Sequence, residues 1–461
     1  MGVSVSGWKL ARAVSRAGQL GVVSGTALAV PFANRLQQGD PGGHLRRAAK
    51  HFPYPGVAER ILERYYIHDG KRPEASYRPC PIPVLAPSAP YLDLTVLATF
   101  AEIYLAKEGH DGIVGINLLE KIQLPTLPTL FGAMLAGVDY VLMGAGIPRS
   151  IPGVLDRLAR GESVSMRVDV EGAGRDEQFF SEFSPKSLSG YRPTDLKRPV
   201  FLAIVSNATL ALTLAKKSNG RVDGFVVEGE TAGGHNAPPR GPLQINSGGE
   251  PVYGVRDVPD MDKIKALGLP FWLAGSYGRV DMLAAALALG AQGIQVGTAF
   301  AFCEESGLLP EYKRRAIALN KQGQLKVFTD PVASPTSFPF KIVQMPGTLS
   351  EKEVYERRPR ICDLGYLRHL YRLEDGSIGY RCPAEPEDDY VRKGGTREDA
   401  CGRKCICNGL AAAVGIGQVR AETGLEPALV TAGSTVSDTT RFLSPGSDSY
   451  SAADVLARLL A

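Results

Sequence analysis

The amino-acid sequence predicts an α/β protein built around a parallel β-sheet. Short apolar runs recur along the chain, and amphipathic stretches with helical spacing separate many of them. The runs are continuous rather than alternating, which is typical of strands covered on both faces of a parallel sheet. Strand and helix therefore alternate along most of the chain, as they do in α/β folds.

Each apolar run predicts one strand. The predicted strands cover residues 19–25, 112–119, 138–146, 199–206, 224–229, 270–276 and 293–300. The clearest helices between them cover residues 150–160, 208–217 and 280–289. Eight such units close a (β/α)8 TIM barrel, so this set is one strand short of a closed barrel.

Two segments are candidates for the remaining strand. The chain opens with a strand-end loop and an amphipathic helix, so we expect the first strand to lie just before Met1. The alternative is residues 82–86, although the prolines beside this run make it a poor central strand.

Three regions depart from the repeat. We expect residues 1–330 to form the barrel, with a helical insertion at about 38–80 and an excursion at about 163–198. Within the insertion, residues 45–51 and 57–66 are the predicted helices. Residues 331–461 form a C-terminal extension that packs on the barrel. A proline-rich loop at 330–340 is either a lid over the barrel mouth or a surface connector.

Composition narrows the class of protein. Of 461 residues, 44% are hydrophobic and 22% are charged, which allows a large core. The net charge of +4 and the lack of a basic tract argue against nucleic acid as a partner. No apolar run reaches the roughly 18 residues of a membrane helix. The seven cysteines are odd in number and sparse over most of the chain. We therefore expect the protein to reside in a reducing cytoplasm, without a disulfide scaffold.

The ends of the last three predicted strands carry glycine and one histidine. The strand at 224–229 runs into Gly233 and Gly234 and then presents His235. Barrel active sites lie at the carboxyl ends of the strands, where glycine lets the backbone approach a flat cofactor.

The two following strand ends predict a phosphate site. They carry Gly275-Ser276 and Gly297-Thr298, and a predicted helix starts near residue 280. Backbone N–H groups, hydroxyls and a helix N-terminus together hold phosphate in many barrels. The alternative is that these glycines only make tight strand-to-helix turns.

These motifs resemble the nitronate monooxygenase family, also called 2-nitropropane dioxygenases. The likeness rests on Glu-Thr-Ala-Gly-Gly-His at 230–235, Ala-Gly-Ser at 274–276 and the run at 284–298. It extends over roughly residues 1–330, with further similarity at 2–8 and 115–119. Members are FMN-dependent barrel flavoproteins, and the trans-acting flavin enoyl reductases are related to them.

The resemblance implies roles for particular residues. It places His235 over the flavin ring as the catalytic residue, with Met1 beside the flavin. The implied cofactor-binding residues are Gly2, Asn117, Gly233, Gly234, Gly275, Ser276, Gly297 and Thr298. This chain departs from the family at Ser276, where glycine is usual, and at Asn236, where a basic residue is usual. Because the segment after His235 borders the substrate, the resemblance identifies the cofactor better than the substrate.

The implied reaction is the oxidation of a nitronate, or a related electron-rich anion, by dioxygen to a carbonyl compound and nitrite. One alternative is an NAD(P)H-dependent flavin enoyl reductase of polyketide or fatty acid synthesis. Another is a non-catalytic flavin- or metal-binding assembly subunit. The expected partners are a small-molecule substrate and dioxygen, and the sequence is compatible with a homo-oligomer.

The C-terminal cysteines are the second chemical feature. Cys401, Cys405 and Cys407 form a C-x3-C-x-C cluster, with Cys382 and Cys362 upstream. Three readings stay open: buried reduced thiols, metal ligands or a redox group. The metal candidates are Cys382, Cys401, Cys405 and Cys407.

Overall fold

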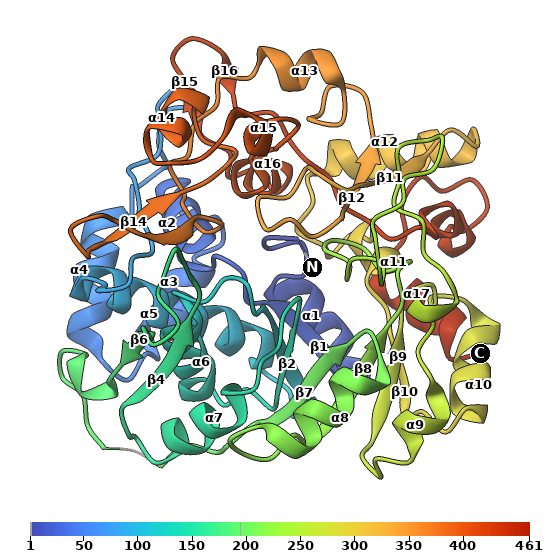
Figure 1. Cartoon of the computed structure of the whole chain (residues 1–461), viewed down its shortest axis with the longest axis horizontal. Coiled ribbons are helices and arrows are strands. Elements are labelled where there is room, and N and C mark those ends of the chain that lie inside the picture. Colours follow the sequence, from blue (N-terminus) through green and yellow to red (C-terminus); the bar gives the residue numbers. More distant parts are fainter. Residues whose placement is uncertain (1, 194) are drawn as a thin grey trace.

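A seven-stranded parallel sheet forms the centre of the molecule. The computed structural model describes residues 2–193 and 195–461 (Figure 1). The strands, in their order across the sheet, are β1 (Gly21–Ser24), β2 (Val114–Leu119), β3 (Tyr140–Gly144), β7 (Val200–Val205), β8 (Gly224–Glu228), β9 (Phe271–Ala274) and β10 (Gly293–Gln295). Every pair of neighbours is parallel. Each strand falls in a predicted apolar run, so the α/β prediction is confirmed.

The strand order is that of a barrel with one strand fewer. In the part of the chain that the structure describes, no ladder joins β1 to β10, and these two strands are the edges of the sheet. The alternative strand at residues 82–86 is wrong, because this segment has no regular secondary structure. Its prolines remove donors that a ladder needs, and the Leu85 N–H instead donates to the Tyr380 hydroxyl at 2.8 Å.

Helices cover the sheet along its length. They are α1 (Trp8–Arg16), α5 (Ala89–Lys107), α6 (Thr126–Leu135), α7 (Ile151–Ala159), α8 (Ala208–Lys217), α9 (Met261–Lys265) and α10 (Val280–Ala288). Helix α5 is buried along most of its 19 residues, because it lies between the sheet and the inserted helices. No helix of the described residues has the length and apolar character needed to cross a membrane.

The insertion and the excursion form as separate elements. The insertion holds α3 (His44–Lys50) and α4 (Pro55–Tyr65), close to the predicted ranges, and follows α2 (Ala29–Gln37). The excursion is an antiparallel pair, β4 (Val164–Val168) with β6 (Phe179–Phe183), beside a short strand β5 (Val170–Glu171).

The C-terminal part lies against the sheet and its helices. Between the sheet and this extension, which starts at residue 331, the chain forms α11 (Thr298–Ala301), α12 (Pro310–Lys321) and β11 (Lys326–Asp330). The strands of the extension are β12 (Phe340–Gln344), β13 (His369–Arg372), β14 (Ile378–Arg381), β15 (Val419–Arg420) and β16 (Gly424–Leu425). Its helices are α13 (Lys352–Arg357), α14 (Glu387–Arg392), α15 (Arg397–Ala400), α16 (Ile406–Ala413) and α17 (Ala452–Leu459). Short 3-10 helices lie at Pro185–Ser187, Val255–Asp257 and Val436–Phe442.

Several contacts join this extension to the rest of the chain. Among them, strand β13 pairs with β5 of the excursion, and α17 packs against α1 and α10. In Figure 1 the orange and red helices α13 to α16 lie above the sheet, whereas the red helix α17 lies at its right side near α10. The extension therefore covers one end of the sheet rather than forming a distant domain.

Candidate active site

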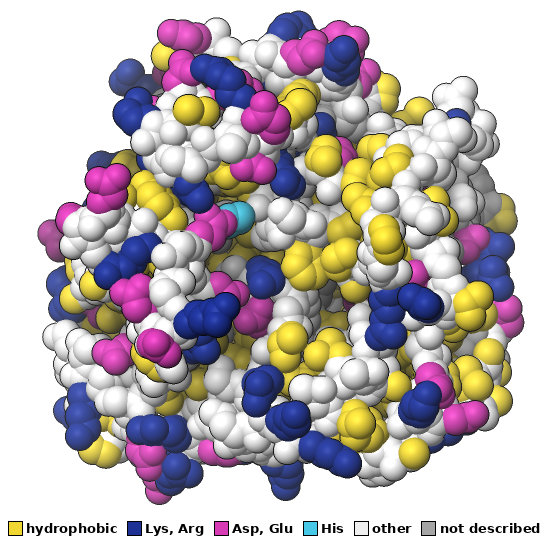
Figure 2. All heavy atoms as spheres, in the orientation of Figure 1, with side chains coloured by type: hydrophobic (Ala, Val, Ile, Leu, Met, Phe, Trp, Pro, Cys, Tyr) yellow, Lys and Arg dark blue, Asp and Glu magenta, His cyan; other side chains and the backbone are white. Residues whose placement is uncertain are grey.

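A cavity of about 600 Å³ opens at the carboxyl ends of the strands and continues along the edge strands β1 and β10 to Leu20 and Gln292 at their amino ends. Residues of the strands form one side of it, among them Asn117 of β2, Glu228 of β8 and Ala274 of β9. The extension forms the other side with apolar side chains such as Leu367 and Leu410. Figure 2 shows a hollow at the centre of this face with hydrophobic side chains on its walls. The volume is in the range of cofactor and ligand pockets in general.

The structure brings His235 and the eight predicted cofactor-binding residues to this cavity. Its lining includes Gly2, Asn117, Gly233, Gly234, His235, Gly275, Ser276, Gly297 and Thr298. Met1 lies outside the described residues. Residues more than 290 positions apart in the chain thus share one site, because parallel strands end at the same edge of a sheet.

The loop after β9 has the form of an anion-binding turn. Gly275 and Ser276 both have positive φ, +87° and +62°. Positive φ is unusual for serine and costs free energy, so such strain often marks a functional turn. The Ser276 hydroxyl is buried without a hydrogen-bond partner among the described residues. A buried hydroxyl without a partner fits a phosphate oxygen, which accepts hydrogen bonds.

The loop after β10 has free space beside Gly297 and a hydrogen bond to the extension at Thr298. A Cβ placed on Gly297 would meet no atom within 4 Å, which leaves room for a ligand. The Thr298 hydroxyl oxygen accepts a hydrogen bond from the Gly433 N–H at 2.8 Å. Thr298 therefore holds the extension, and its own O–H can still donate toward the cavity.

His235 is held by residues of the extension. Its Nε2 lies 2.7 Å from the Ser334 Oγ, and its ring stands edge-on to Phe340 at 4.7 Å between centroids. Burial lowers the pKa of His235 to about 3, so the imidazole is neutral at neutral pH. The loop at 330–340 therefore reaches the cavity. The sequence had not distinguished between a lid over the barrel mouth and a surface connector for this loop. No motif in the sequence identifies Ser334 as a partner of His235.

Glu228 is a further ionisable residue of the cavity. It ends the buried strand β8 and lines the cavity, and burial raises its pKa to about 7. The sequence analysis assigns it no role. The available signal was an acidic residue that closes an otherwise apolar strand.

The backbone after β8 is packed tightly against the extension. A Cβ on Gly233 would lie 2.8 Å from the backbone of Ala432 and Gly433. The Gly234 N–H donates to the Thr431 Oγ1 at 3.0 Å, and the Lys341 N–H donates to the Gly234 carbonyl at 3.0 Å. Glycine is required at 233 by this close approach, which the sequence alone does not show.

The cysteines gather at a second, much smaller cavity. Cys362, Cys382, Cys405 and Cys407 all line it. Cys401, which the sequence grouped with them, is exposed and does not line this cavity. Within residues 2–193 and 195–461, no three His, Cys, Asp or Glu side chains are arranged to hold a metal ion.

The fold and the site together define an α/β protein whose ligand cavity lies at the carboxyl ends of parallel strands. Residues 194–335 match the family model described as nitronate monooxygenase. This segment contains all the predicted site residues except Gly2 and Asn117. The resemblance that the sequence predicts is thereby confirmed over this part of the chain.

Individual relatives agree over a limited length. The chain is 33% identical over 129 residues to the probable nitronate monooxygenase of Bacillus subtilis (strain 168). That match covers 28% of this chain and 35% of the relative, so the chain matches about a third of the relative's length.

Two solved structures are similar over nearly the whole chain. FabK from Thermotoga maritima has a TM-score of 0.47 at 15% identity, covering 99% of this chain and 88% of FabK. A nitroalkane oxidase from Streptomyces ansochromogenes has a TM-score of 0.44 at 14% identity, covering 100% of this chain and 92% of the oxidase. Both TM-scores are below 0.5, so neither similarity supports a statement about function.

Proposed function

We propose that this protein is an FMN-dependent oxidoreductase that oxidises a nitronate with dioxygen to a carbonyl compound and nitrite. The observation that carries the proposal is one cavity lined by the strand-end glycines and His235, within a segment that matches the nitronate monooxygenase family. When bound, the flavin supplies the electron transfer from substrate to dioxygen. The protein supplies placement and control of charge.

The turns after β9 and β10 are suited to the cofactor phosphate. Gly275 and Gly297 let the backbone approach an anion, and the buried Ser276 hydroxyl supplies a donor. Asn117, in the second half of β2, adds an amide that can hydrogen-bond to the polar edge of the ring.

We propose one tautomer for His235. The Ser334 Oγ accepts the Thr336 N–H at 3.2 Å and lies 2.8 Å from the Thr336 Oγ1, so its proton can go to Thr336 or to His235. In the proposed tautomer Ser334 donates to His235 Nε2, and the ring proton is on Nδ1. A neutral Nδ1–H is a hydrogen-bond donor for an anionic oxygen of the substrate. This arrangement suits a nitronate, which is already deprotonated and needs orientation more than a base.

The wall opposite the strand ends indicates the rest of the substrate. It is formed by apolar side chains of the extension, such as Leu367, Ile406 and Leu410. A nitronate with an apolar chain suits this wall. The same wall favours a second candidate, an NAD(P)H-dependent flavin enoyl reductase, because an acyl chain is also apolar.

One pair of experiments separates the two candidates. Nitrite and a carbonyl compound released from an alkyl nitronate in air, without bleaching of the flavin by NAD(P)H under anaerobic conditions, support the monooxygenase. Rapid anaerobic bleaching by NAD(P)H, without nitrite release from nitronates, supports the reductase and contradicts the primary proposal.

A further inference from the structure

The small cavity joins cysteines from three separate segments of the extension. Cys362 precedes β13, Cys382 follows β14, and Cys405 and Cys407 lie at the start of α16. Cys382 and Cys405 are buried, whereas Cys362 and Cys407 keep partial exposure. The four thiols therefore share one small cavity.

Two of the thiols, Cys362 and Cys382, pack together in the small cavity. Hydrogen bonding between them, with Arg368 nearby, lowers the pKa of Cys362. The same hydrogen bonding, together with burial, raises the pKa of Cys382. A partly exposed cysteine with thiolate character beside a buried thiol has the arrangement of an attacking and a resolving cysteine.

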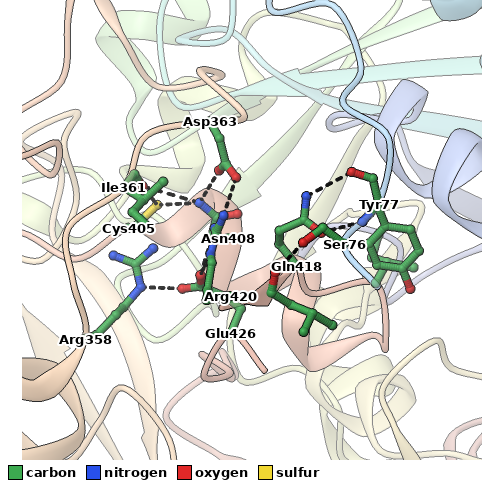
Figure 3. Close-up of polar contacts among 12 residues, drawn as sticks. Ser76, Tyr77, Arg358, Ile361, Asp363, Cys405, Asn408, Gln418, Arg420 and Glu426 are labelled. Atoms are coloured by element: carbon green, nitrogen blue, oxygen red, sulfur yellow. Dashed lines mark hydrogen bonds and ion pairs between the residues drawn. The ribbon is translucent and has the colours of Figure 1, made fainter. Parts of the chain in front are cut away.

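The backbone on both sides of Cys362 is fixed by a polar network (Figure 3). The Asn408 side chain donates to the Asp363 carboxylate at 2.8 Å and lies 3.3 Å from the Cys405 sulfur. Cys405 in turn donates to the Ile361 carbonyl at 3.6 Å. Arg420 holds the other oxygen of Asp363 at 2.7 Å. Cys362 therefore stands between two anchored residues, which keeps its side chain beside Cys382.

We propose that Cys362 and Cys382 form a redox-active dithiol that a peroxide converts to a disulfide. The Cys362 thiolate attacks one oxygen of the peroxide and becomes a sulfenic acid, and the other oxygen leaves as water. The Cys382 thiol then attacks the sulfenic sulfur, an S–S bond forms, and a second water leaves. Overall, two thiols and one hydrogen peroxide give one disulfide and two waters. A dithiol reductant converts the disulfide back to the thiols.

The dithiol lies directly behind the wall of the larger cavity. Leu364, Leu367, Ile406 and Cys407 line both cavities. Oxidation at Cys362 therefore occurs in the layer of the extension that faces the predicted active site. The proposal does not depend on which reaction that site performs.

Peptide mapping of the whole protein tests the proposal, because trypsin separates the relevant cysteines. Cleavage places Cys362 in residues 361–368, Cys382 in 382–392, Cys401 in 398–403, and Cys405 with Cys407 in 405–420. After hydrogen peroxide and alkylation of the remaining thiols, we expect the first two peptides to be joined by a disulfide that dithiothreitol removes. A disulfide to the 405–420 peptide instead, or no modification of Cys362, overturns the proposal.

Variants identify the attacking sulfur. In Cys382→Ser, dimedone should trap a sulfenic acid on Cys362, whereas Cys362→Ser should show no adduct on Cys382. Cys401→Ser is the matched control and should form the disulfide as the unaltered protein does. If a variant does not fold, the peptide map of the unaltered protein still tests the disulfide between Cys362 and Cys382. Equimolar zinc or iron in the purified protein, lost on oxidation, would show a metal centre and also contradict the dithiol.

Discussion

At the residue scale, burial shifts the pKa values of His235 and Glu228, two ionisable side chains of the cavity, in opposite directions. It lowers the pKa of His235 to about 3 and raises the pKa of Glu228 to about 7. Both shifts favour the neutral form, because a low-dielectric site disfavours charge on either group. The cavity therefore holds two neutral or nearly neutral hydrogen-bonding groups near pH 7.

The role of His235 is tested by its removal. We expect His235→Ala to lower turnover of a nitronate by about 100-fold, since a positioned acid–base or hydrogen-bonding group contributes on the order of 10²–10⁴. Flavin content should be unchanged, because the phosphate turns lie on other strands. Ser334→Ala, which removes only the Nε2 partner, should cost less. Steady-state rates with bound flavin quantified make the comparison, and unchanged turnover in His235→Ala would contradict the assigned role.

Glu228 gives a pH-dependent stability with a definite sign. Its pKa in the folded state is about 7, against an ordinary value of 4.5, so the folded state retains a proton that the unfolded state has lost. Between pH 4.5 and 7 this group lowers the free energy of unfolding, by about 3 kcal/mol in total, and above pH 7 its contribution is constant.

The matched variant is Glu228→Gln, which cannot titrate. Denaturant unfolding of cofactor-free protein gives the free energy of unfolding at pH 5 and at pH 8. The difference between the variant and the unaltered protein should shift in favour of the variant at pH 8. An identical pH dependence in the two proteins would show that the Glu228 pKa is not raised.

At the element scale, the strand-end loops and the extension form one site. The turn after β8 contacts residues 431–433, the turn after β10 contacts Gly433, and His235 contacts Ser334. Each contact joins a loop of the sheet to the extension. The extension is therefore needed to fix the geometry of the cavity.

Gly233 tests this packing. In Gly233→Ala the added Cβ would lie 2.8 Å from the backbone of Ala432 and Gly433, and overpacking of this kind typically costs about 1–3 kcal/mol. Gly229→Ala is the control, because a Cβ there meets nothing within 4 Å. Urea unfolding of both variants compares them. Equal stability of the two would show that the extension does not press on residue 233.

The extension depends in turn on a buried ion-pair network (Figure 3). Glu426 contacts Arg358 and, at 3.0 Å, the Nε of Arg420, and its side chain is only 2% exposed. Removing its charge leaves two buried guanidinium groups with a single acidic partner, Asp363, on Arg420. The network therefore holds α16 and the 361–363 segment together.

Glu426→Gln should lower the free energy of unfolding by about 3–5 kcal/mol, the usual cost of breaking a buried ion pair. The control is Glu356→Gln, whose carboxylate is 57% exposed and pairs with Lys352 on the surface of α13. This control should change stability by less than about 1 kcal/mol. A small loss in both variants would contradict the structural role of the network.

At the scale of the whole molecule, local patterns predict the strands but not the contacts between distant segments. Apolar runs located every strand of the parallel sheet, and the glycine ends located His235 and the turns after β9 and β10, because these depend on neighbours in the chain. Gly2 and Asn117 came from the family resemblance, and Glu228 was missed. The contacts of Ser334 with His235 and of Cys362 with Cys382 depend on how the extension packs. The sequence analysis grouped Cys401 with the other cysteines because of its short spacing from them. In the structure Cys401 is exposed and does not line the small cavity that the others share.

The central claim is that the cavity at the strand ends holds FMN. The most direct test is the flavin content of the purified protein, read from its visible spectrum and from chromatography of the cofactor released on denaturation. We predict about one FMN per chain, and a loss of that FMN when bulky residues replace Gly275 and Ser276. Protein that purifies without flavin and does not bind added FMN, or that holds a different flavin, would contradict this account.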